Sequence, residues 1–294
     1  VSFVEVLLDI LPTGPVPGGA PMNVAYHLHK QQKNPAVITR IGNDTKGKEL
    51  IQIFSDFGVC TDFFQVDHDH DTGKVYAEPN ENNEVVYDIV KPAAWDFINY
   101  EDRLESLVNH ADFFVFGSLA ARNNESKNTL LRLLNAAKTK VLDINLRAPH
   151  YTRKIVEELL SKADLIKLNL AELELITGWF SKYTSLKDRV KSIIDRFNIK
   201  NIVVTMGGDG AILFYGVNEY THKGYKVTVA DTVGSGDAFL AGLLGKFAQG
   251  DTPENALEYA SRMGAFVATK MGACPEYDPS EIYETETYTN RLNK

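Results

Sequence analysis

The chain has 294 residues, of which 44% are hydrophobic and 24% charged, a composition typical of a globular protein with a large core. The formal net charge of −8 argues against a surface that binds nucleic acid or anionic membranes, so any phosphate ligand must be held by a local site. Cys60 and Cys274 are the two cysteines and have neither metal-binding nor redox spacing, which favours reduced thiols in a cytoplasmic protein.

Strand-like and helix-like segments alternate along most of the chain. The first apolar run, 4–10, predicts a strand, and because Glu5, Asp9 and Pro12 interrupt the apolar opening we expect neither a signal peptide nor a membrane span. The other runs of strand length are 34–42, 112–118, 140–146, 165–169 and 201–207, and the segments with helical periodicity are 22–31, 47–58, 128–138, 153–163 and 185–197. This alternation predicts a mostly parallel sheet covered by helices on both faces, with ligands bound at the carboxyl ends of its strands.

Residues 71–91 break the alternation. Two runs of alternating apolar and polar residues flank the sequence "NENN" at 80–83, which predicts a hairpin instead of a strand–helix unit. Together with residues 12–20, this hairpin is expected to form a small sheet beside the main one. The sequence contains no tandem repeat, low-complexity tract or linker, so we expect a single domain over 1–294.

Three patterns imitate known ligand sites without meeting their requirements. The sequence "GNDTKGKE" at 42–49 has the spacing of a P-loop, but Glu49 stands where a Ser or Thr must hold Mg²⁺, so we expect a turn before a surface helix. In "GSGDAFLAG" at 234–242, Phe239 replaces the third glycine of a dinucleotide-binding fingerprint. The run "DHDHD" at 67–71 is interpreted as an acidic, solvated loop and not as a metal site.

The strongest candidate is "DTVGSGDAFLAGLL" at 231–244, where a glycine turn leads into a helix. A helix N-terminus has unpaired amides and a partial positive charge, so the amides of Gly234, Ser235 and Gly236 can hold an anion. Asp237 lies in the first helical turn, where a carboxylate either accepts a proton in a reaction or only complements the helix dipole. The local sequence leaves both interpretations open.

Further polar residues and glycines follow the other predicted strands or begin helices. They are Asp9, Gly18, Gly19, Asn23, Asn145, Arg147, Lys167, Asn169, Glu172, Thr205, Gly207, Gly208 and Gly210. Arg147 and Lys167 can contact phosphate, Asn169 and Glu172 can support hydrated Mg²⁺, and the group near the first strand suits a polyhydroxylated ligand. Each also has a structural alternative: a capped helix at 169–172, a hairpin turn at 205–210, and ordinary capping elsewhere.

Taken together, these segments resemble the ribokinase-like (PfkB-type) carbohydrate kinases, from the first strand to about Pro279. The segment "DTVGSGD" at 231–237 is similar to the family's DTxGAGD signature, with Ser235 in place of alanine. The segments "GGAPMNVAYHL", "FGSLAAR" and "DINLRAPHY" look most like the bacterial fructokinase branch. One departure is Val4, where fructokinases usually carry glycine in a GExLxD opening, whereas Asp9 of that motif is retained.

The resemblance implies a three-layer α/β/α sandwich with a mostly parallel central sheet and a small β lid formed by 12–20 and 71–91. It implies that Asp237 is the general base, and that the amides of Gly234, Ser235 and Gly236 form the anion hole for the transferred phosphoryl group. The implied sugar contacts are Asp9, Gly18, Gly19, Asn23 and Ser118. The implied phosphate and nucleotide contacts are Arg147, Lys167, Asn169, Thr205, Gly207, Gly210, Ser261 and Gly264. The resemblance also implies that Glu172 meets Mg²⁺ through water, and that a K⁺ ion is bound, mainly through the backbone, by Asp231, Val233, Val267, Lys270 and Gly272.

The activity implied by the resemblance is ATP-dependent phosphorylation of a sugar, with fructose as the expected substrate and fructose 6-phosphate as the product. We expect a cytoplasmic enzyme that uses Mg²⁺, is activated by K⁺, and pairs into a homodimer through the lid, with no nucleic-acid or membrane partner. Alternative substrates are 2-dehydro-3-deoxygluconate, ribose or a nucleoside, because Lys74, Tyr76 and Tyr87 in the lid segments suit acidic or aromatic groups. A non-catalytic sugar sensor is a further alternative, which the presence of Asp237 and its glycines opposes.

Overall fold

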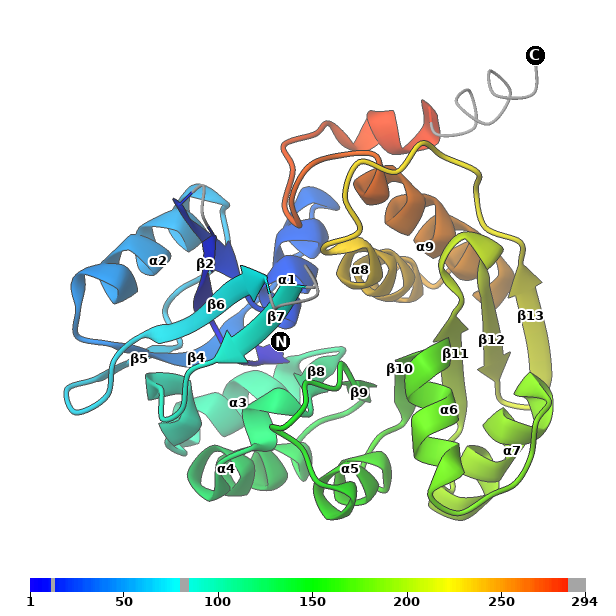
Figure 1. Ribbon diagram of the computed structural model, residues 1–294, viewed down its shortest axis with the longest axis horizontal. Helices are drawn as coiled ribbons and strands as arrows, with labels where there is room; N and C mark the ends of the chain where they lie inside the picture. Colours follow the sequence, from blue (N-terminus) through cyan, green and yellow to red (C-terminus); the bar gives the residue numbers. More distant parts are fainter. Residues whose placement is uncertain (12–13, 80–84, 285–294) are drawn as a thin grey trace.

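The computed structural model describes residues 1–11, 14–79 and 85–284. Within them, one large sheet has the strand order β13-β12-β11-β10-β9-β8-β1-β4-β5, and its neighbouring strands are parallel except for the pairs β11–β12 and β12–β13 (Figure 1). The strands are β1 (Ser2–Phe3), β4 (Val37–Gly42), β5 (Phe64–Asp67), β8 (Phe114–Gly117), β9 (Lys140–Asp143), β10 (Leu165–Asn169), β11 (Asn201–Thr205), β12 (Ala211–Tyr215) and β13 (Asn218–His222).

Helices cover both faces of this sheet, which confirms the predicted three-layer sandwich (Figure 1). One layer contains α1 (Ala20–Lys30), α2 (Thr45–Asp56), α8 (Ser235–Phe247) and α9 (Pro253–Ala268). The other layer contains α3 (Asp102–His110), α4 (Asn124–Leu134), α5 (Arg153–Leu160), α6 (Leu170–Gly178) and α7 (Leu186–Phe197). Short 3₁₀ helices are η1 (Ala94–Phe97), η2 (Leu119–Ala121), η3 (Gly207–Asp209) and η4 (Pro279–Glu284).

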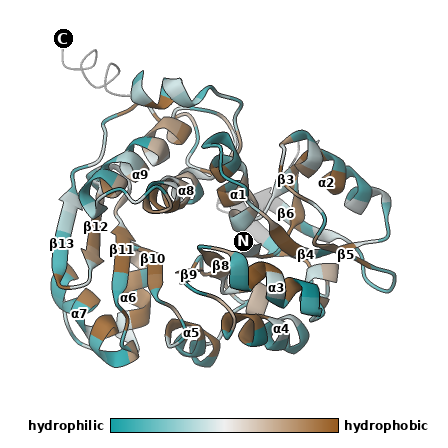
Figure 2. Cartoon of the chain, turned by 180° about the vertical axis from the view of Figure 1, so that it is seen from behind, coloured by the Kyte–Doolittle hydropathy of each residue, from teal (hydrophilic) through white to brown (hydrophobic). Residues whose placement is uncertain are grey.

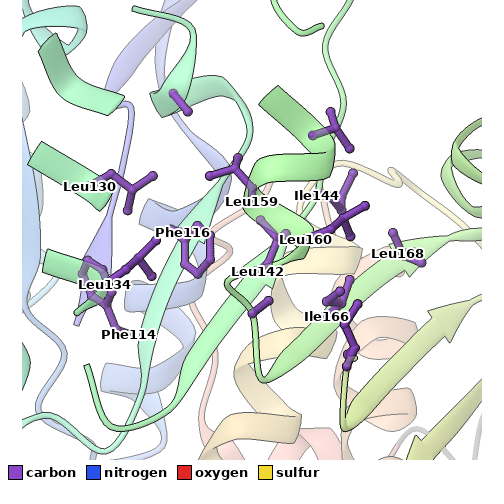
Figure 3. Packing of buried hydrophobic residues seen from close by; sticks show 14 of the residues in the cluster. Phe114, Phe116, Leu130, Leu134, Leu142, Ile144, Leu159, Leu160, Ile166 and Leu168 are labelled. Carbon is purple, nitrogen blue, oxygen red and sulfur yellow. The ribbon is translucent and has the colours of Figure 1, made fainter. Parts of the chain in front are cut away.

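The core lies between the sheet and these helices because the central strands are apolar on both faces. Figure 3 shows one side, where Phe116, Leu142 and Ile166 of β8, β9 and β10 meet Leu134 and Leu159 of α4 and α5. Figure 2 shows β11 and β12 mostly in brown, whereas the edge strand β13 is teal. Polar side chains at a sheet edge disfavour pairing with a further strand.

A second, four-stranded sheet in the described residues has the order β3-β2-β6-β7. Its strands are β2 (Leu7–Leu11), β3 (Gly14–Gly18), β6 (Gly73–Pro79) and β7 (Val85–Ile89). The predicted strand at 4–10 is therefore wrong in its bounds: β1 joins the main sheet, whereas Leu7–Leu11 pairs with β3 and β6. An apolar run cannot indicate that the chain passes from one sheet to another. The turn predicted at 80–83 lies outside the described residues.

The P-loop-like segment is an ordinary helix start. The Asp44 side chain caps α2 by accepting the N–H of Gly47 at 2.7 Å, and it also accepts the N–H of Thr72 at 2.9 Å. Because a carboxylate already occupies the helix N-terminus, no phosphate site remains there. Lys48 is exposed on the surface of α2, as expected for a turn before a surface helix.

In the acidic run at 67–71, Asp67 is buried, contrary to the interpretation as a solvated loop, whereas His68, Asp69 and Asp71 are exposed as that interpretation expects. The Asp67 carboxylate accepts the N–H groups of Asp69 and His70 at 2.8 and 2.9 Å and lies 2.7 Å from the Arg40 Nε. Nowhere in residues 1–11, 14–79 and 85–284 do three His, Cys, Asp or Glu side chains gather as a metal site. Cys60 and Cys274 are free thiols. Among the described helices, none has the length and apolar character needed to cross a bilayer.

Candidate active site

Two charged side chains lie on neighbouring parallel strands beside the start of α8. Asp143 in β9 is the register partner of Lys167 in β10. Their strand neighbours Leu142 and Ile166 pack in the α3–α7 layer, so the alternation of a strand turns Asp143 and Lys167 toward α8. The Lys167 Nζ lies 3.0 and 2.8 Å from the two Asp143 carboxylate oxygens, and both side chains are buried.

The charge of Lys167 is retained despite this burial. Burial alone would lower the pKa of Lys167, yet the carboxylates of Asp143, Asp237 and Glu172 together raise it. The ammonium is therefore positive at neutral pH. It lies next to the backbone of Gly236, because a Cβ added there would lie 3.1 Å from the Lys167 Nζ.

The turn before α8 presents backbone amides to the same space. Gly234 has a φ of +76°, which favours glycine, and a Cβ added there would lie 2.5 Å from the Cα of Ala273. The Ser235 hydroxyl donates to the Gly264 carbonyl of α9 at 2.9 Å. No side chain in the described part of the chain caps the N-terminus of α8. These amides and the Lys167 ammonium therefore form a site suited to an anion.

Asp237 lies in the first turn of α8 and is the acid–base candidate. One of its carboxylate oxygens, Oδ2, accepts a hydrogen bond of 2.7 Å from the Asn23 Nδ2. Burial raises the pKa of Asp237 to about 6, a shift that Lys167 opposes and the Asp143 carboxylate supports. A carboxylate with this pKa is ionised at neutral pH and still basic enough to accept a proton in a reaction.

Asn23 holds this carboxylate in place. Its Oδ1 accepts a hydrogen bond from the Cys274 thiol, with an Sγ–O distance of 3.3 Å. This contact fixes the orientation of the amide, because Oδ1 then faces the thiol and Nδ2 faces Asp237. The sequence predicts Asn23 as a sugar contact; in the structure its amide bonds to Asp237 and Cys274.

Of the other predicted sugar contacts, Ser118 follows β8, where its hydroxyl donates to the Asn145 carbonyl, and the remaining ones lie around Asp9 in β2. A Cβ on Gly18 would lie 2.3 Å from the Asp9 Oδ2, and one on Gly19 would lie 2.5 Å from the Glu5 carbonyl oxygen. The close approach of the chain to these groups therefore requires both glycines. Burial raises the pKa of Asp9, and the charge of Arg147 opposes that shift.

Arg147 follows β9 and is exposed. Its charge lowers the pKa values of Asp9, Glu5 and Asp237 relative to the effect of burial alone. Asp9 lies in β2 and Glu5 shortly before it, whereas Asp237 lies in α8, on the other side of the site. The Arg147 guanidinium is thus within electrostatic reach of both the predicted sugar side and the anion side.

Asn169 and Glu172 form a capping box at the start of α6. The capped helix, which the sequence offered as the alternative to a ligand site, is therefore present. The Asn169 Oδ1 accepts the Glu172 N–H, and the Glu172 carboxylate accepts the N–H of Asn169, each at 2.8 Å. The other Glu172 oxygen accepts the N–H of Leu146 at 2.9 Å. Glu172 therefore ties α6 to the segment that carries Arg147, and both its oxygens already accept backbone hydrogen bonds.

The predicted nucleotide contacts lie along β11 and α9. The glycine turn after β11 leads into the antiparallel strand β12, and a Cβ on Gly210 would lie 1.9 Å from the His222 carbonyl oxygen, so the hairpin itself requires that glycine. A Cβ on Gly207 would meet nothing within 4 Å. Thr205 and Ser261 donate their hydroxyls to backbone carbonyls at 3.4 and 2.8 Å.

The residues predicted around a K⁺ ion lie close together beside the turn. The Asp231 carboxylate accepts the N–H groups of Val233 and Gly272, both at 3.0 Å. The N–H of Lys270 donates to the Val267 carbonyl at 2.9 Å. Asp231 thus ties the turn before α8 to the segment after α9.

The sequence analysis missed three groups in this region: Asp143, Cys274 and Glu5. Asp143 lies in the middle of the strand predicted at 140–146, so its place in the sequence did not single it out, whereas the observed strand β9 ends at this residue. Glu5 is buried, and its Oε2 has no hydrogen-bond partner among the described residues. Burial raises the pKa of Glu5 to about 7, with Arg147 opposing and Asp237 supporting the shift.

The sequence matches the model of the pfkB family of carbohydrate kinases over residues 13–279. It is 28% identical to Fructokinase-1 of Oryza sativa subsp. japonica over 311 residues, which covers 96% of this chain and 95% of that protein. It is 27% identical to the fructokinase of Vibrio alginolyticus over 290 residues, which covers 92% of each. The structure is similar to that of fructokinase from Vibrio cholerae O395 in its fructose, ADP and calcium ion bound form, with a TM-score of 0.82, 24% identity and 98% of each chain covered.

Proposed function

Because the chain belongs to the pfkB family of carbohydrate kinases, we propose that it transfers the γ-phosphoryl group of ATP to fructose, giving fructose 6-phosphate and ADP. The observation that carries this proposal is the position of Asp237, a carboxylate with a pKa raised to about 6 beside the uncapped amides of α8. The fructokinases among the relatives support fructose as the substrate.

In the proposed reaction, Asp237 accepts the proton of the attacking sugar hydroxyl. The hydroxyl oxygen forms a bond to the γ-phosphorus while the bond from that phosphorus to the bridging oxygen of ADP breaks. The amides of 234–236 and the Lys167 ammonium stabilise the charge on the phosphoryl oxygens, and the Arg147 guanidinium can reach the same oxygens. Asn23 keeps the Asp237 carboxylate oriented through its 2.7 Å hydrogen bond.

The residues present fit ATP with its metal ions. Both oxygens of Glu172 accept backbone N–H groups, which suits Mg²⁺ held through water and the ATP phosphates better than direct ligation by this carboxylate. Mg²⁺ would neutralise phosphate charge when bound. For K⁺, we assign Asp231 and the backbone carbonyls of Val233, Val267, Lys270 and Gly272. Asn169, Thr205, Gly207, Gly210, Ser261 and Gly264 remain our assignment for the nucleotide.

We assign the four-stranded sheet β3-β2-β6-β7 as the lid sheet, and the positions of Lys74 and Tyr76 in it support a neutral sugar as the substrate. Lys74 and Tyr76 are register partners of Leu8 and Ile10, so they lie on the face of the lid opposite Asp9. Lys74 also bonds to Asp71 at 2.9 Å. Both side chains thus point away from a ligand held by Asp9, which weakens the argument from Lys74 for 2-dehydro-3-deoxygluconate and the argument from Tyr76 for a nucleoside. The Tyr87 side chain lies outside the described residues.

We also propose that the lid pairs two copies of the chain. The support is Tyr76, which is 37% exposed on the lid face opposite Asp9, where a second lid sheet can cover it. Light scattering after size-exclusion chromatography should give the mass of a dimer, and a monomer mass for the wild type would reject this arrangement.

Fructose is expected to be the best substrate in a panel of sugars and nucleosides tested with ATP, and Asp9→Ala should raise the KM for fructose about tenfold. A sugar hydroxyl buried without its partner costs about 1–3 kcal/mol, whereas the KM for ATP should change little. Release of ADP measures both. Lys74→Ala, on the lid face opposite Asp9, is the control for sugar binding and should leave the KM for fructose at the wild-type value. A rise in the KM for ATP instead would move Asp9 to the nucleotide side.

The pH profile is expected to show an acid limb from Asp237. Because burial raises the pKa of Asp237 to about 6, the base becomes protonated below that pH, and kcat/KM should fall about tenfold per pH unit there while remaining level from pH 7 to 8. Rates measured between pH 5 and 8 test this. A profile that is level down to pH 5 would mean that no group with a pKa near 6 has to be ionised.

A further inference from the structure

His27 connects the helix that carries Asn23 to a segment near the end of the described chain. It lies on α1, one helical turn after Asn23, and is completely buried. Its Nε2 lies 2.9 Å from the Ala273 carbonyl oxygen, and its Nδ1 lies 3.0 Å from the Tyr277 hydroxyl. Because a carbonyl can only accept, Nε2 carries the proton and Nδ1 accepts from the hydroxyl. Burial lowers the pKa of His27 to about 4, so the ring is neutral.

The ring therefore bonds to both ends of residues 273–277, which we call the back segment. This segment supports the turn before α8, because a Cβ on Gly234 would lie 2.5 Å from the Ala273 Cα. The two backbones are thus in direct contact, and a displacement of Ala273 would displace the amides of the turn. The Tyr26 hydroxyl adds a further bond from α1 to the back segment, 2.6 Å from its carbonyl at residue 275.

The back segment also contacts the group that orients the base. Cys274 donates its thiol to Asn23, and Asn23 donates to Asp237. His27 thus acts on the amide turn through Ala273 and on Asp237 through Cys274 and Asn23.

We propose that His27 is a positioning residue: it fixes the back segment so that the amide turn and the Asp237 carboxylate keep the geometry that phosphoryl transfer needs. This inference rests on the proposed kinase function. A buried histidine with satisfied hydrogen bonds is more often a purely structural residue. Here both hydrogen-bond partners of His27 belong to the back segment. That segment contacts the turn before α8 through Ala273 and Asn23 through Cys274. Its loss should therefore impair the transition state more than substrate binding.

Three variants separate these possibilities. His27→Phe keeps an aromatic ring and removes both hydrogen bonds, Tyr277→Phe removes one of them, and His27→Gln retains a donor and an acceptor. We expect kcat to fall about tenfold or more in His27→Phe and about threefold in Tyr277→Phe, with KM values for sugar and ATP within about threefold of wild type. Part of the loss should be recovered in His27→Gln.

A matched control is Thr177→Val in α6. Thr177 is also completely buried, and its hydroxyl donates to the Leu173 carbonyl at 2.7 Å, on the other face of the sheet. This variant should lower Tm without changing kcat. If His27→Phe and Tyr277→Phe behaved in the same way, with a lower Tm and an unchanged kcat, His27 would be a structural residue and the inference would be wrong.

Thiol reactivity gives a readout that does not depend on any activity. In a Cys60→Ser background Cys274 is the remaining cysteine, and burial raises its pKa, so it should react slowly with 5,5′-dithiobis(2-nitrobenzoate). His27→Phe and Tyr277→Phe should increase that rate about tenfold, whereas Thr177→Val should not. If no sugar were phosphorylated by the wild type, the proposed function would fail, yet these rates would still decide whether His27 fixes the back segment. Equal rates in all variants would show that it does not.

Discussion

Asp237→Asn is expected to lower kcat by about 10²- to 10⁴-fold, the range found when a positioned general base is lost. The asparagine has the same size and can still accept the Asn23 hydrogen bond, which measures 2.7 Å in the wild type, but it cannot take up the proton of the sugar hydroxyl. The KM values for sugar and ATP should change much less. Steady-state kinetics with both substrates varied measures this. A kcat near the wild-type value would reduce Asp237 to a partner of the helix dipole.

A thermal melt of the same variant checks that its fold is intact. Burial raises the pKa of Asp237 from 3.8 to about 6, so the folded state disfavours the charged form, and stability falls as the pH rises from the lower value through the higher one. Asparagine avoids that cost. Asp237→Asn should therefore melt at a higher temperature than wild type at pH 8, and the gain should shrink below pH 6. A lower Tm at pH 8 would mean that the loss of activity reflects damage to the fold.

Gly236→Val is expected to reduce kcat by at least about 10²-fold, comparable to removing a donor from an oxyanion hole. A Cβ at this position would lie 3.1 Å from the Lys167 Nζ, and the further methyl groups of valine would fill the space between the amides and the ammonium. The transferred phosphoryl group could then not reach either. Kinetics at saturating ATP, together with a melting curve, measures the effect.

Two conservative changes serve as controls for the glycine variant. Ser235→Ala removes a hydroxyl that donates to the Gly264 carbonyl at 2.9 Å, so it should cost about 1 kcal/mol of stability but change kcat by less than about threefold. Lys48→Ala changes the exposed lysine of the P-loop-like segment and should leave activity intact. An inactive Lys48→Ala combined with an active Gly236→Val would place the nucleotide at residues 42–49 and overturn the proposed site.

The order of strands and helices, and the residues at strand ends, could be predicted because both leave local signals in the sequence. Continuous apolar runs indicate a buried parallel sheet, and the polar residues near their carboxyl ends, such as Lys167, mark the edge where we expect ligands to bind. Asp143 was missed because its importance depends on register: only the pairing of β9 with β10 places it opposite Lys167.

Contacts between distant segments could not be predicted for the same reason. Asn23 suited a sugar contact by its place at the start of a helix, and nothing nearby in the sequence indicated that its amide would bond to Asp237 and Cys274. The passage of the first apolar run from the main sheet into the four-stranded sheet was equally hidden, because Leu7 and Leu8 suit either sheet. Single-sequence patterns report burial but not the partner that covers a residue.

The hydrogen bond between Asn23 and Asp237 joins residues 214 positions apart in the chain. On the ribosome, at about 5–20 residues per second, this separation corresponds to about 10–40 s of synthesis between the emergence of the two partners. During that interval the growing polypeptide already contains Asp9, Gly18 and Gly19. It still lacks Asp237, the proposed base, and the amides of 234–236, the proposed anion site. Under the proposed function, phosphoryl transfer therefore cannot begin before the segment that carries Asp237 has been synthesised, and a nascent chain that ends before it cannot consume ATP.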